Sequence, residues 1–584
     1  MRARAQRWHD GLAWGRVAAL LALALTWYER CGSHDGSATA KTLIVVATGA
    51  LVLGLSIAVS AAARRLARSA DALGYYEAGL SRLVGKLPPA TAGSAYLPAD
   101  LSDEHPYAGD LDLFGPQSLF ALLNMGRTSS GQATLAAWLL AGAGRDEVLA
   151  RQGTVAELAA AVELREELWR AAGAVGKDVR VSALGTWLAA PVEAVSRSTR
   201  IGMLFLGLGG LVALVALAFG HVAAPVASFV GLFLIAKRFR GQVASVGLSA
   251  QSRADELSAV VGLATLVETA PFVSPRLSAL KAALSSGGTS ARVAVAQLQR
   301  LIAWFESRRN PFFGLVTAPM LLSTQFAFAI EGWRAQHGPT AARWMTALGE
   351  LEALVSLATF AFEHPQLPFP EIVAEDNGPR FEGRALAHPL LSPATRVAND
   401  ARLDSDHRLL LVTGSNMSGK STYLRTIGAN TVLALAGAPV VAEHLRLSRL
   451  EIGASLRISD SLQAGVSRFF AEIKRLRTVV DLCERSPMTL FLLDEILHGT
   501  NSDDRLAGAG SLVKRLVERG AVGLCTTHDL ALARIVDEIG PAAANVHFED
   551  VISEGQIRFD YRVKPGVVTR GNALALMKLV GLPV

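Results

Sequence analysis

One eight-residue stretch constrains the fold of this 584-residue chain more than any other. Residues 414–421 read GSNMSGKS, which matches the pattern G-x-x-x-x-G-K-[ST] in full. The apolar stretch 407–413 predicts a buried strand before it, and 421–437 predicts a helix after it. A glycine-rich loop between a strand and a helix presents backbone N–H groups and a helix N-terminus to a phosphate group. The carboxy-terminal part of the chain is therefore expected to be an α/β P-loop domain that binds a nucleotide.

The residue types of this loop have distinct expected roles. Lys420 is placed to reach the β- and γ-phosphates, and the hydroxyl of Ser421 is placed to bind Mg²⁺. The expected ligands are therefore ATP and Mg²⁺. We expect the nucleotide to be surrounded by Gly414, Ser415, Asn416, Met417, Ser418, Gly419, Lys420, Ser421 and Thr422.

Two later strands are predicted to end in polar residues suited to nucleotide hydrolysis. The apolar run at 488–493 ends in Asp494, which is expected to bind Mg²⁺, and in Glu495, which is expected to polarise the attacking water. The predicted strand at 521–527 is followed by His528, a candidate hydrogen-bond donor to the γ-phosphate. The alternative for His528 is an ordinary polar turn residue. Lys420, Glu495 and His528 are thus the candidate catalytic residues.

Apolar stretches elsewhere predict two transmembrane helical hairpins. Residues 11–28 and 42–63 form the first, and 201–236, which holds no charged side chain, is long enough for two short spans. Arginine and lysine flank both hairpins, which predicts that both termini and the loop 64–200 lie in the cytoplasm. The whole chain has 18% charged residues, below the roughly 25% typical of soluble domains. The predicted location is therefore a multi-pass protein of the cytoplasmic membrane, with its ATPase domain in the cytoplasm.

Two of the predicted membrane segments have alternative interpretations, and one further apolar run has to be assigned. Residues 11–28 could be a signal peptide, although the sequence that follows has no small-residue cleavage pattern. Residues 201–236 could be a helical hairpin in a soluble core. The apolar run 311–333 contains Pro319 and Glu331, so a core helix is favoured there over a fifth span.

Charge and cysteine content set broad limits on the environment of the protein. The net charge is +6, which favours anionic partners such as a lipid surface or nucleic acid without identifying either. The three cysteines show no metal-binding spacing, and a reduced compartment is the simplest interpretation.

The remaining sequence is predicted to be helical as far as a Pro- and Gly-rich linker near residue 364. The expected organisation is an all-α region interrupted by the second hairpin and followed by the ATPase domain. The predicted boundaries are 1–63 for the first hairpin, 64–200 for helical core, 201–236 for the second hairpin, 237–363 for helical core and lever, 364–405 for the linker and start of the ATPase region, and 406–584 for the ATPase domain.

Taken in order, these motifs resemble those of the MutS family of ATPases. The stretch TGSNMSGKSTYLRTIG resembles the phosphate loop of that family. The segments 452–480, DEILHGTNSDD at 494–504 and 547–583, which contains KPG and GLP, resemble the family motifs that follow it. In 452–480, Asp460, Ser467 and the helix from Phe469 fall on motif positions. Upstream, RALAHPLLSP at 384–393 resembles the start of the ATPase domain, and 105–200 and 241–363 resemble more weakly the helical core and lever.

The resemblance implies a homodimer in which the ATPase domains pack together and each site is completed by the partner. Asn501 and Ser502 are the candidate residues for that contact in trans, within the segment Gly499–Asp503. It also implies DNA as a candidate partner. The sequence departs from the family pattern at His498, where arginine is common, and at Asn501, where serine is common. Predicted spans take the place of a mismatch-reading domain in the first hundred residues, which corresponds to a membrane-anchored branch of the family.

Two other functions remain open from the sequence. A transporter of the ABC type would also combine spans with a phosphate loop, but AGVSRFFAEI at 464–473 stands where an LSGGQ-like segment would precede Asp494. The predicted spans also lack the polar residues expected of a substrate path. A scaffold with a vestigial nucleotide site is disfavoured because Lys420, Ser421, Asp494, Glu495 and His528 are all present.

Overall fold

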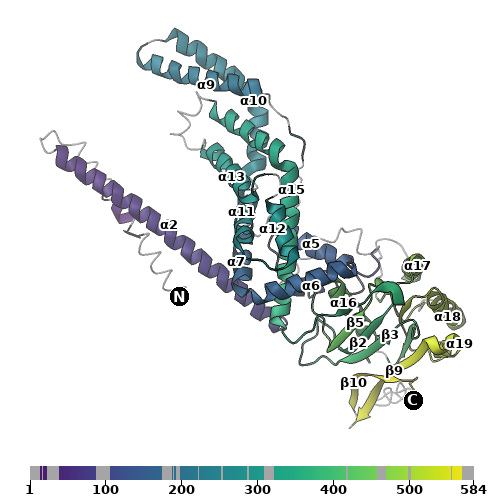
Figure 1. Ribbon diagram of the computed structural model, residues 1–584. Coiled ribbons are helices and arrows are strands. Elements are labelled where there is room, and N and C mark those ends of the chain that lie inside the picture. The colour runs from purple at the N-terminus through teal and green to yellow at the C-terminus, as the bar shows by residue number, and fades with distance from the viewer. Residues whose placement is uncertain are drawn as a thin grey trace, which may run out of the picture. The chain divides into compact units, whose positions relative to one another are not determined.

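The computed structural model divides the chain into two compact units, Met1–Ser81 and Arg82–Val584. Figure 1 shows the elements of both units. The structure describes residues 14–15, 17–20, 22, 38–86, 105–173, 187–188, 190–192, 197–220, 222–251, 254–285, 288–307, 321–415, 418–456, 468–497, 501–553 and 556–568.

The first unit is described mainly through one long helix, α2 (Ala38–Leu83). This helix contains the predicted span 42–63 and continues without a break beyond it, because the residues that follow are rich in good helix formers. Val46, Leu51, Leu53 and Ile57 on α2 are exposed large apolar side chains. Most of the predicted span 11–28, and the connection between the two spans, lie outside the described residues.

The second unit begins with a bundle of helices around an apolar core. Ser118 and Thr128 cap the N-termini of the first two helices through their side-chain oxygens, and Pro275 occupies the first turn of another. The helices are α4 (Leu119–Leu123), α5 (Ser129–Leu140), α6 (Arg145–Ala160), α7 (Val162–Ala172), α11 (Ala254–Thr269), α12 (Pro275–Leu284), α13 (Ala291–Ser307) and α15 (Leu322–Glu363).

Helix α15 is the longest element of this bundle and packs against α5, α6, α10, α12 and α13 (Figure 1). It contains the described part of the apolar run 311–333, and most of its side chains are buried within the protein. This burial agrees with the interpretation of 311–333 as a core helix. The helix continues through Pro339, although proline inside a helix removes a backbone hydrogen bond and usually kinks or ends it. Packing on several sides keeps its axis continuous there, and the carbonyl of Leu188 lies so close to Gly338 that a Cβ atom would be only 2.7 Å from it.

The segment 201–236 forms a helical hairpin, as its apolar composition predicted. Helix α9 (Arg197–Ala218) leads through a turn at Gly220, with a φ of 87°, into α10 (Ala223–Gln251). Many large apolar side chains of this hairpin are exposed, including Phe205, Val212 and Phe233. Among the described residues, three helical stretches are long and apolar enough to cross a membrane: Val46–Leu83, Ser198–Leu217 and the mostly buried Leu322–Glu363.

Two sheets form the carboxy-terminal part of the second unit. The larger has the strand order β10-β9-β4-β8-β7-β6 and is parallel except for the antiparallel pair β9–β10. Its strands are β4 (Leu409–Thr413), β6 (Glu451–Ser455), β7 (Thr489–Asp494), β8 (Val522–Thr527), β9 (Ala543–Ser553) and β10 (Gln556–Pro565). The associated helices are α16 (Lys420–Ala436), α17 (Arg468–Arg485), α18 (Ser502–Glu518) and α19 (Ile535–Ile539).

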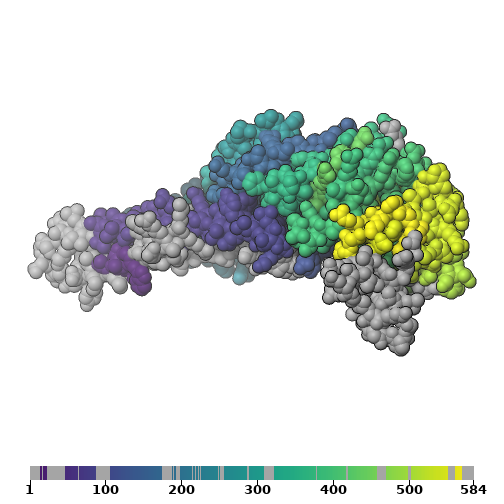
Figure 2. Space-filling view, turned by 90° about the horizontal axis from the view of Figure 1, so that it is seen from below, coloured from purple at the N-terminus to yellow at the C-terminus, as the bar shows by residue number. Residues whose placement is uncertain are grey.

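The smaller sheet has the order β1-β5-β2-β3, with β1 (Glu371–Ile372), β2 (Phe381–Leu386), β3 (Asn399–Leu403) and β5 (His444–Leu447). Three of these strands lie in the stretch interpreted from sequence as a linker, where proline and glycine obscured the short apolar patterns. Short 3-10 turns occur at Glu375–Asn377, Leu532–Arg534 and Gly540–Ala542. In the space-filling view the late strands (yellow) lie directly against the green surface of earlier residues, in keeping with the pairing of β9 with β4 (Figure 2).

The larger sheet positions the candidate site through the carboxyl ends of its parallel strands. Strands β4, β7 and β8 are almost completely buried, with Leu411, Phe491 and Cys525 among the core residues. Since neighbouring parallel strands end at the same edge of a sheet, the residues after β4, β7 and β8 meet there.

Candidate functional site

The phosphate loop joins the end of β4 to the first turn of α16, as its sequence context predicts. Gly414 and Gly419 have φ angles of 144° and 107°, which side chains rarely adopt. A Cβ atom on Gly414 would lie 2.8 Å from the backbone oxygen of Phe548 on β9, so the backbone also needs glycine for space. Asn416 and Met417 lie outside the described residues.

Lys420 begins α16 and turns its ammonium group back into the loop. The side chain is only 4% exposed, and Nζ donates to the carbonyl oxygens of Gly414 at 2.8 Å and Ser415 at 2.9 Å. Nζ also lies 3.2 Å from Oε1 of Glu495. A buried cation beside a glycine loop fits a bound phosphate, because phosphate oxygens carry negative charge and accept charge-assisted hydrogen bonds from an ammonium group.

Asp494 and Glu495 follow from the end of β7 and are both held by Thr526 on the neighbouring strand β8. Thr526 Oγ1 donates a hydrogen bond to Asp494 Oδ1 and accepts one from the backbone N–H of Glu495 at 2.9 Å. The same N–H lies 3.2 Å from the carbonyl oxygen of Thr526. Glu495 has a φ of 46°, an uncommon conformation for a residue with a side chain. The strand ends at Asp494, and the carboxylate of Glu495 lies beside Lys420 and His528.

The residues suited to Mg²⁺ are Asp494 and Ser421, an exposed residue in the first turn of α16. Among the described residues, no group of three His, Cys, Asp or Glu side chains could hold a metal ion by itself. This donor set fits Mg²⁺, which usually takes one or two protein oxygens and completes its shell with water and substrate phosphates. Thr422, the other predicted residue of this turn, is also exposed.

His528 lies at the end of β8 beside Glu495. Its Nδ1 is 3.5 Å from Glu495 Oε1, and its side chain is 42% exposed. The carboxylate of Glu495 thus lies within 3.5 Å of both the Lys420 ammonium and the His528 ring. The fold therefore brings together the three residues that the sequence nominated as catalytic from three separate segments.

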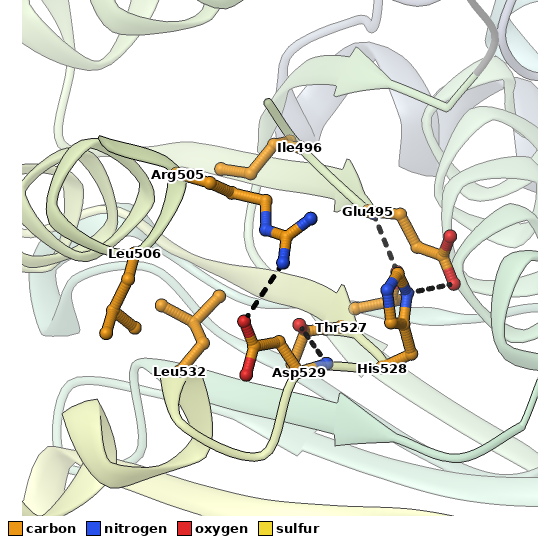
Figure 3. Close-up of a pocket in the computed structure, with 9 residues that line it drawn as sticks. Glu495, Ile496, Arg505, Leu506, Thr527, His528, Asp529 and Leu532 are labelled. Atoms are coloured by element: carbon orange, nitrogen blue, oxygen red, sulfur yellow. Dashed lines mark hydrogen bonds and ion pairs between the residues drawn. The ribbon is translucent and has the colours of Figure 1, made fainter. Parts of the chain in front are cut away.

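A small hollow opens beside this cluster (Figure 3). Asp529 connects two segments that line the hollow. Its Oδ2 pairs with Arg505 Nη2 at 3.2 Å, and its backbone N–H donates to Thr527 Oγ1 at 2.9 Å. The ion pair joins the turn that carries His528 to helix α18. The hollow is lined by Glu495, Ile496, Arg505, Leu506, Thr526, Thr527, His528, Asp529 and Leu532.

Burial also affects a thiol next to the cluster. Cys525, on β8, is fully buried, and burial together with the nearby negative charge of Asp494 raises the pKa of its thiol to about 12. Cys525 is therefore a core side chain whose thiol reacts poorly as a nucleophile.

The two residues predicted to act in trans lie at the start of α18. Asn501 caps this helix, since its side-chain oxygen accepts the backbone N–H of Asp504 at 2.8 Å. Ser502 is the first residue of the helix and is exposed. The motif positions His498, Gly499, Thr500, Asp460 and Ser467 lie outside the described residues.

Sequence reasoning identified Thr526 as a strand-end residue but missed its contacts with Asp494 and Glu495. It also missed Glu472, a buried residue of α17 that accepts a hydrogen bond from the backbone N–H of Leu497. The register that places Asp494 opposite Thr526 is a property of the sheet. A threonine one position before Thr527-His528 was the only local signal.

Comparison with known families agrees with this geometry. Residues 410–584 match the family model of MutS domain V. The carboxy-terminal part of this chain is thus similar to MutS domain V. That domain is the ATPase domain of the MutS family and generally uses ATP and Mg²⁺, so the match supports a MutS-family member. The matched range begins within β4 and includes the phosphate loop, Asp494, Glu495 and His528. Proteins of this family act as dimers and bind DNA.

Proposed function

We propose that this protein is a membrane-anchored ATPase of the MutS type, in which ATP binding and hydrolysis switch a dimer between two states. The observation that carries the proposal is the convergence of Lys420, Glu495 and His528 at the carboxyl edge of the MutS-type sheet.

Each residue of the site has a defined task in this proposal. Lys420 and the loop N–H groups bind and orient the β- and γ-phosphates, while Ser421 and Asp494 hold Mg²⁺. The metal ion supplies neutralisation of the charge that develops on the phosphates. Glu495 accepts a hydrogen bond from the attacking water and orients it toward the γ-phosphorus. His528 donates to a γ-phosphate oxygen, and its contact with Glu495 couples the two side chains.

The dimer of this proposal packs through the ATPase domains, with Asn501 and Ser502 at the start of α18 facing the partner site. Asn501 already supports the helix start through its cap, which orients the exposed N–H groups of the first turn. Because the first turn also carries Asp503 and Asp504, the proposed contact with the γ-phosphate of ATP on the partner is assigned to the hydroxyl of Ser502, an exposed residue.

The membrane part of the proposal rests on α2 and the α9–α10 hairpin. The window Ser198–Leu217 has 20 residues, which gives a helix about 30 Å long, close to the hydrocarbon thickness of a bilayer. The exposed Phe205, Val212 and Phe233 are costly in water and favourable in lipid. The charges that flank these segments favour an ATPase domain on the cytoplasmic face.

The test of the proposal uses the full-length protein in detergent, with Lys420→Ala and Glu495→Ala variants. We expect Lys420→Ala to lose binding of a fluorescent ATP analogue, and Glu495→Ala to bind it but hydrolyse ATP at least a hundredfold more slowly. Size-exclusion chromatography with ATP should show an accumulated dimer for Glu495→Ala. If Glu495→Ala hydrolyses ATP at the wild-type rate, the assignment of the water-orienting residue is wrong.

DNA as the partner of the switch is proposed from the family match alone, and it has its own test. Binding to duplex DNA is measured with ATP, with ADP and without nucleotide across a salt series, with Lys420→Ala as the control. Binding that depends on nucleotide and falls steeply with salt supports a DNA partner. Intact ATPase activity without DNA binding at low salt would remove DNA from the proposal.

A further inference from the structure

The exposed apolar surface of the α9–α10 hairpin ends abruptly in basic side chains. On α10, the exposed Phe233 and Leu234 are followed within two turns by Lys237, Arg238 and Arg240, which are also exposed. We call these three residues the basic collar. Because the hairpin is antiparallel around its turn at Gly220, Arg200 of α9 lies at the same level.

Acidic side chains are missing from the hairpin sequence itself. No Asp or Glu occurs between Glu193 and Asp255, a range that includes all of α9 and α10. On the neighbouring helix α15, Glu331 is buried and forms an ion pair with Arg334 at 2.7 Å. The collar therefore presents positive charge that no acid of its own hairpin neutralises.

An exposed tryptophan lies at the same level of the bundle. Trp304, near the end of α13, is 53% exposed and stacks on Phe326 of α15, with ring centroids 6.3 Å apart. Phe328, two residues further along α15, makes an edge-to-face contact with Phe239, with ring centroids 5.3 Å apart. Phe239 lies between Arg238 and Arg240 of the collar. Because Phe326 and Phe328 lie within one turn of α15, these two ring contacts place Trp304 and the collar at the same level along that helix.

We propose that the basic collar binds the phosphate groups of anionic phospholipids where the hairpin leaves the hydrocarbon. Three features support a lipid partner: helix α9 of the hairpin contains a 20-residue apolar window of bilayer length, cations directly follow the apolar part of α10, and an exposed indole lies at the same level. Each cation near an anionic surface favours binding roughly fivefold, so the collar is expected to select strongly for anionic over zwitterionic lipid. This inference rests on the proposed membrane insertion of the hairpin and adds the class of lipid.

Lipid binding at the collar would also affect the helix bundle, because α10 continues from the collar into that bundle. The carboxy-terminal half of α10 packs on α13 and α15, with Val243 and Val246 buried. Headgroups held by the collar would therefore fix the depth and tilt of a helix that is packed into the bundle.

The experiment measures which lipid contacts Trp304 in nanodiscs of phosphatidylglycerol and phosphatidylcholine in equal amounts. Brominated chains are placed on one lipid or on the other, and the Trp304 signal is the difference between wild type and Trp304→Phe. We expect brominated phosphatidylglycerol to quench Trp304 several-fold more than brominated phosphatidylcholine. In the triple variant Lys237→Gln, Arg238→Gln, Arg240→Gln, the two brominated lipids should quench Trp304 fluorescence equally.

A matched control neutralises three exposed cations of the ATPase domain, Arg477→Gln, Lys514→Gln and Arg515→Gln, and should keep the preference. If both lipids quench the wild type equally and the protein stays in the bilayer after a carbonate wash, the collar does not select anionic lipid. The proposed membrane insertion of the hairpin would then still hold. Release from the bilayer by carbonate would overturn both. Loss of the preference when duplex DNA is added would assign the collar to nucleic acid instead.

Discussion

Replacing Thr526 with valine isolates one hydrogen-bonding group at the centre of the site. Thr526 is completely buried, and its hydroxyl donates to Asp494 and accepts from the N–H of Glu495. Valine is close to threonine in shape and replaces the hydroxyl with a methyl group, so both polar contacts are lost. The N–H of Glu495 retains the carbonyl oxygen of Thr526 at 3.2 Å, so the backbone turn is expected to survive.

The expected magnitude follows from the charge on Asp494. A hydrogen bond to a charged group contributes about 1.5–3 kcal/mol. If that hydrogen bond orients the carboxylate for Mg²⁺, its loss lowers the affinity for Mg²⁺ by roughly tenfold to a hundredfold. The affinity for ATP in the absence of Mg²⁺ should change little, because Lys420 and the loop are untouched.

The assay titrates Mg²⁺ into the protein with a fluorescent ATP analogue and, separately, follows ATP hydrolysis. Thr526→Ser restores the hydroxyl and should recover most of the wild-type Mg²⁺ midpoint. In a double-mutant cycle, Thr526→Val should have no further effect in an Asp494→Asn background, because both changes remove the same contact. A Thr526→Val protein with the wild-type Mg²⁺ midpoint and a normal melting temperature would refute the reasoning.

Three further predictions concern the loop, the hollow and the core. Arg505→Ala should lower the rate of ATP hydrolysis by up to about fivefold without changing ATP affinity, because its solvent-accessible ion pair with Asp529 contributes about 1 kcal/mol. The measurement is steady-state kinetics, with Arg505→Lys as the control. Gly414→Ala should abolish binding of the ATP analogue, since its Cβ would lie 2.8 Å from the Phe548 backbone oxygen; normal binding would show that the loop has another shape. Cys525 should not react with a maleimide at pH 8 in the folded protein, as a pKa of about 12 leaves roughly one thiolate in ten thousand, and mass spectrometry should find it modified only after unfolding.

The sequence by itself determined the local chemistry of the site. The phosphate loop, the Asp494–Glu495 pair and His528 could each be found because every one follows a short apolar strand, a pattern that depends on neighbouring residues alone. The helical hairpin at 201–236 was predictable for the same reason, since a long uncharged apolar run has few other stable structures.

The tertiary structure decided which of these pieces meet. Strand order places β8 between β4 and β7, so His528 and Thr526 lie beside residues that are more than thirty positions away in the chain. No local pattern encodes that register, because it depends on which buried faces pack together. The continuity of α15 through Pro339 and the strands hidden in the expected linker have the same origin: packing against neighbours outweighs the local preference of a proline or a glycine.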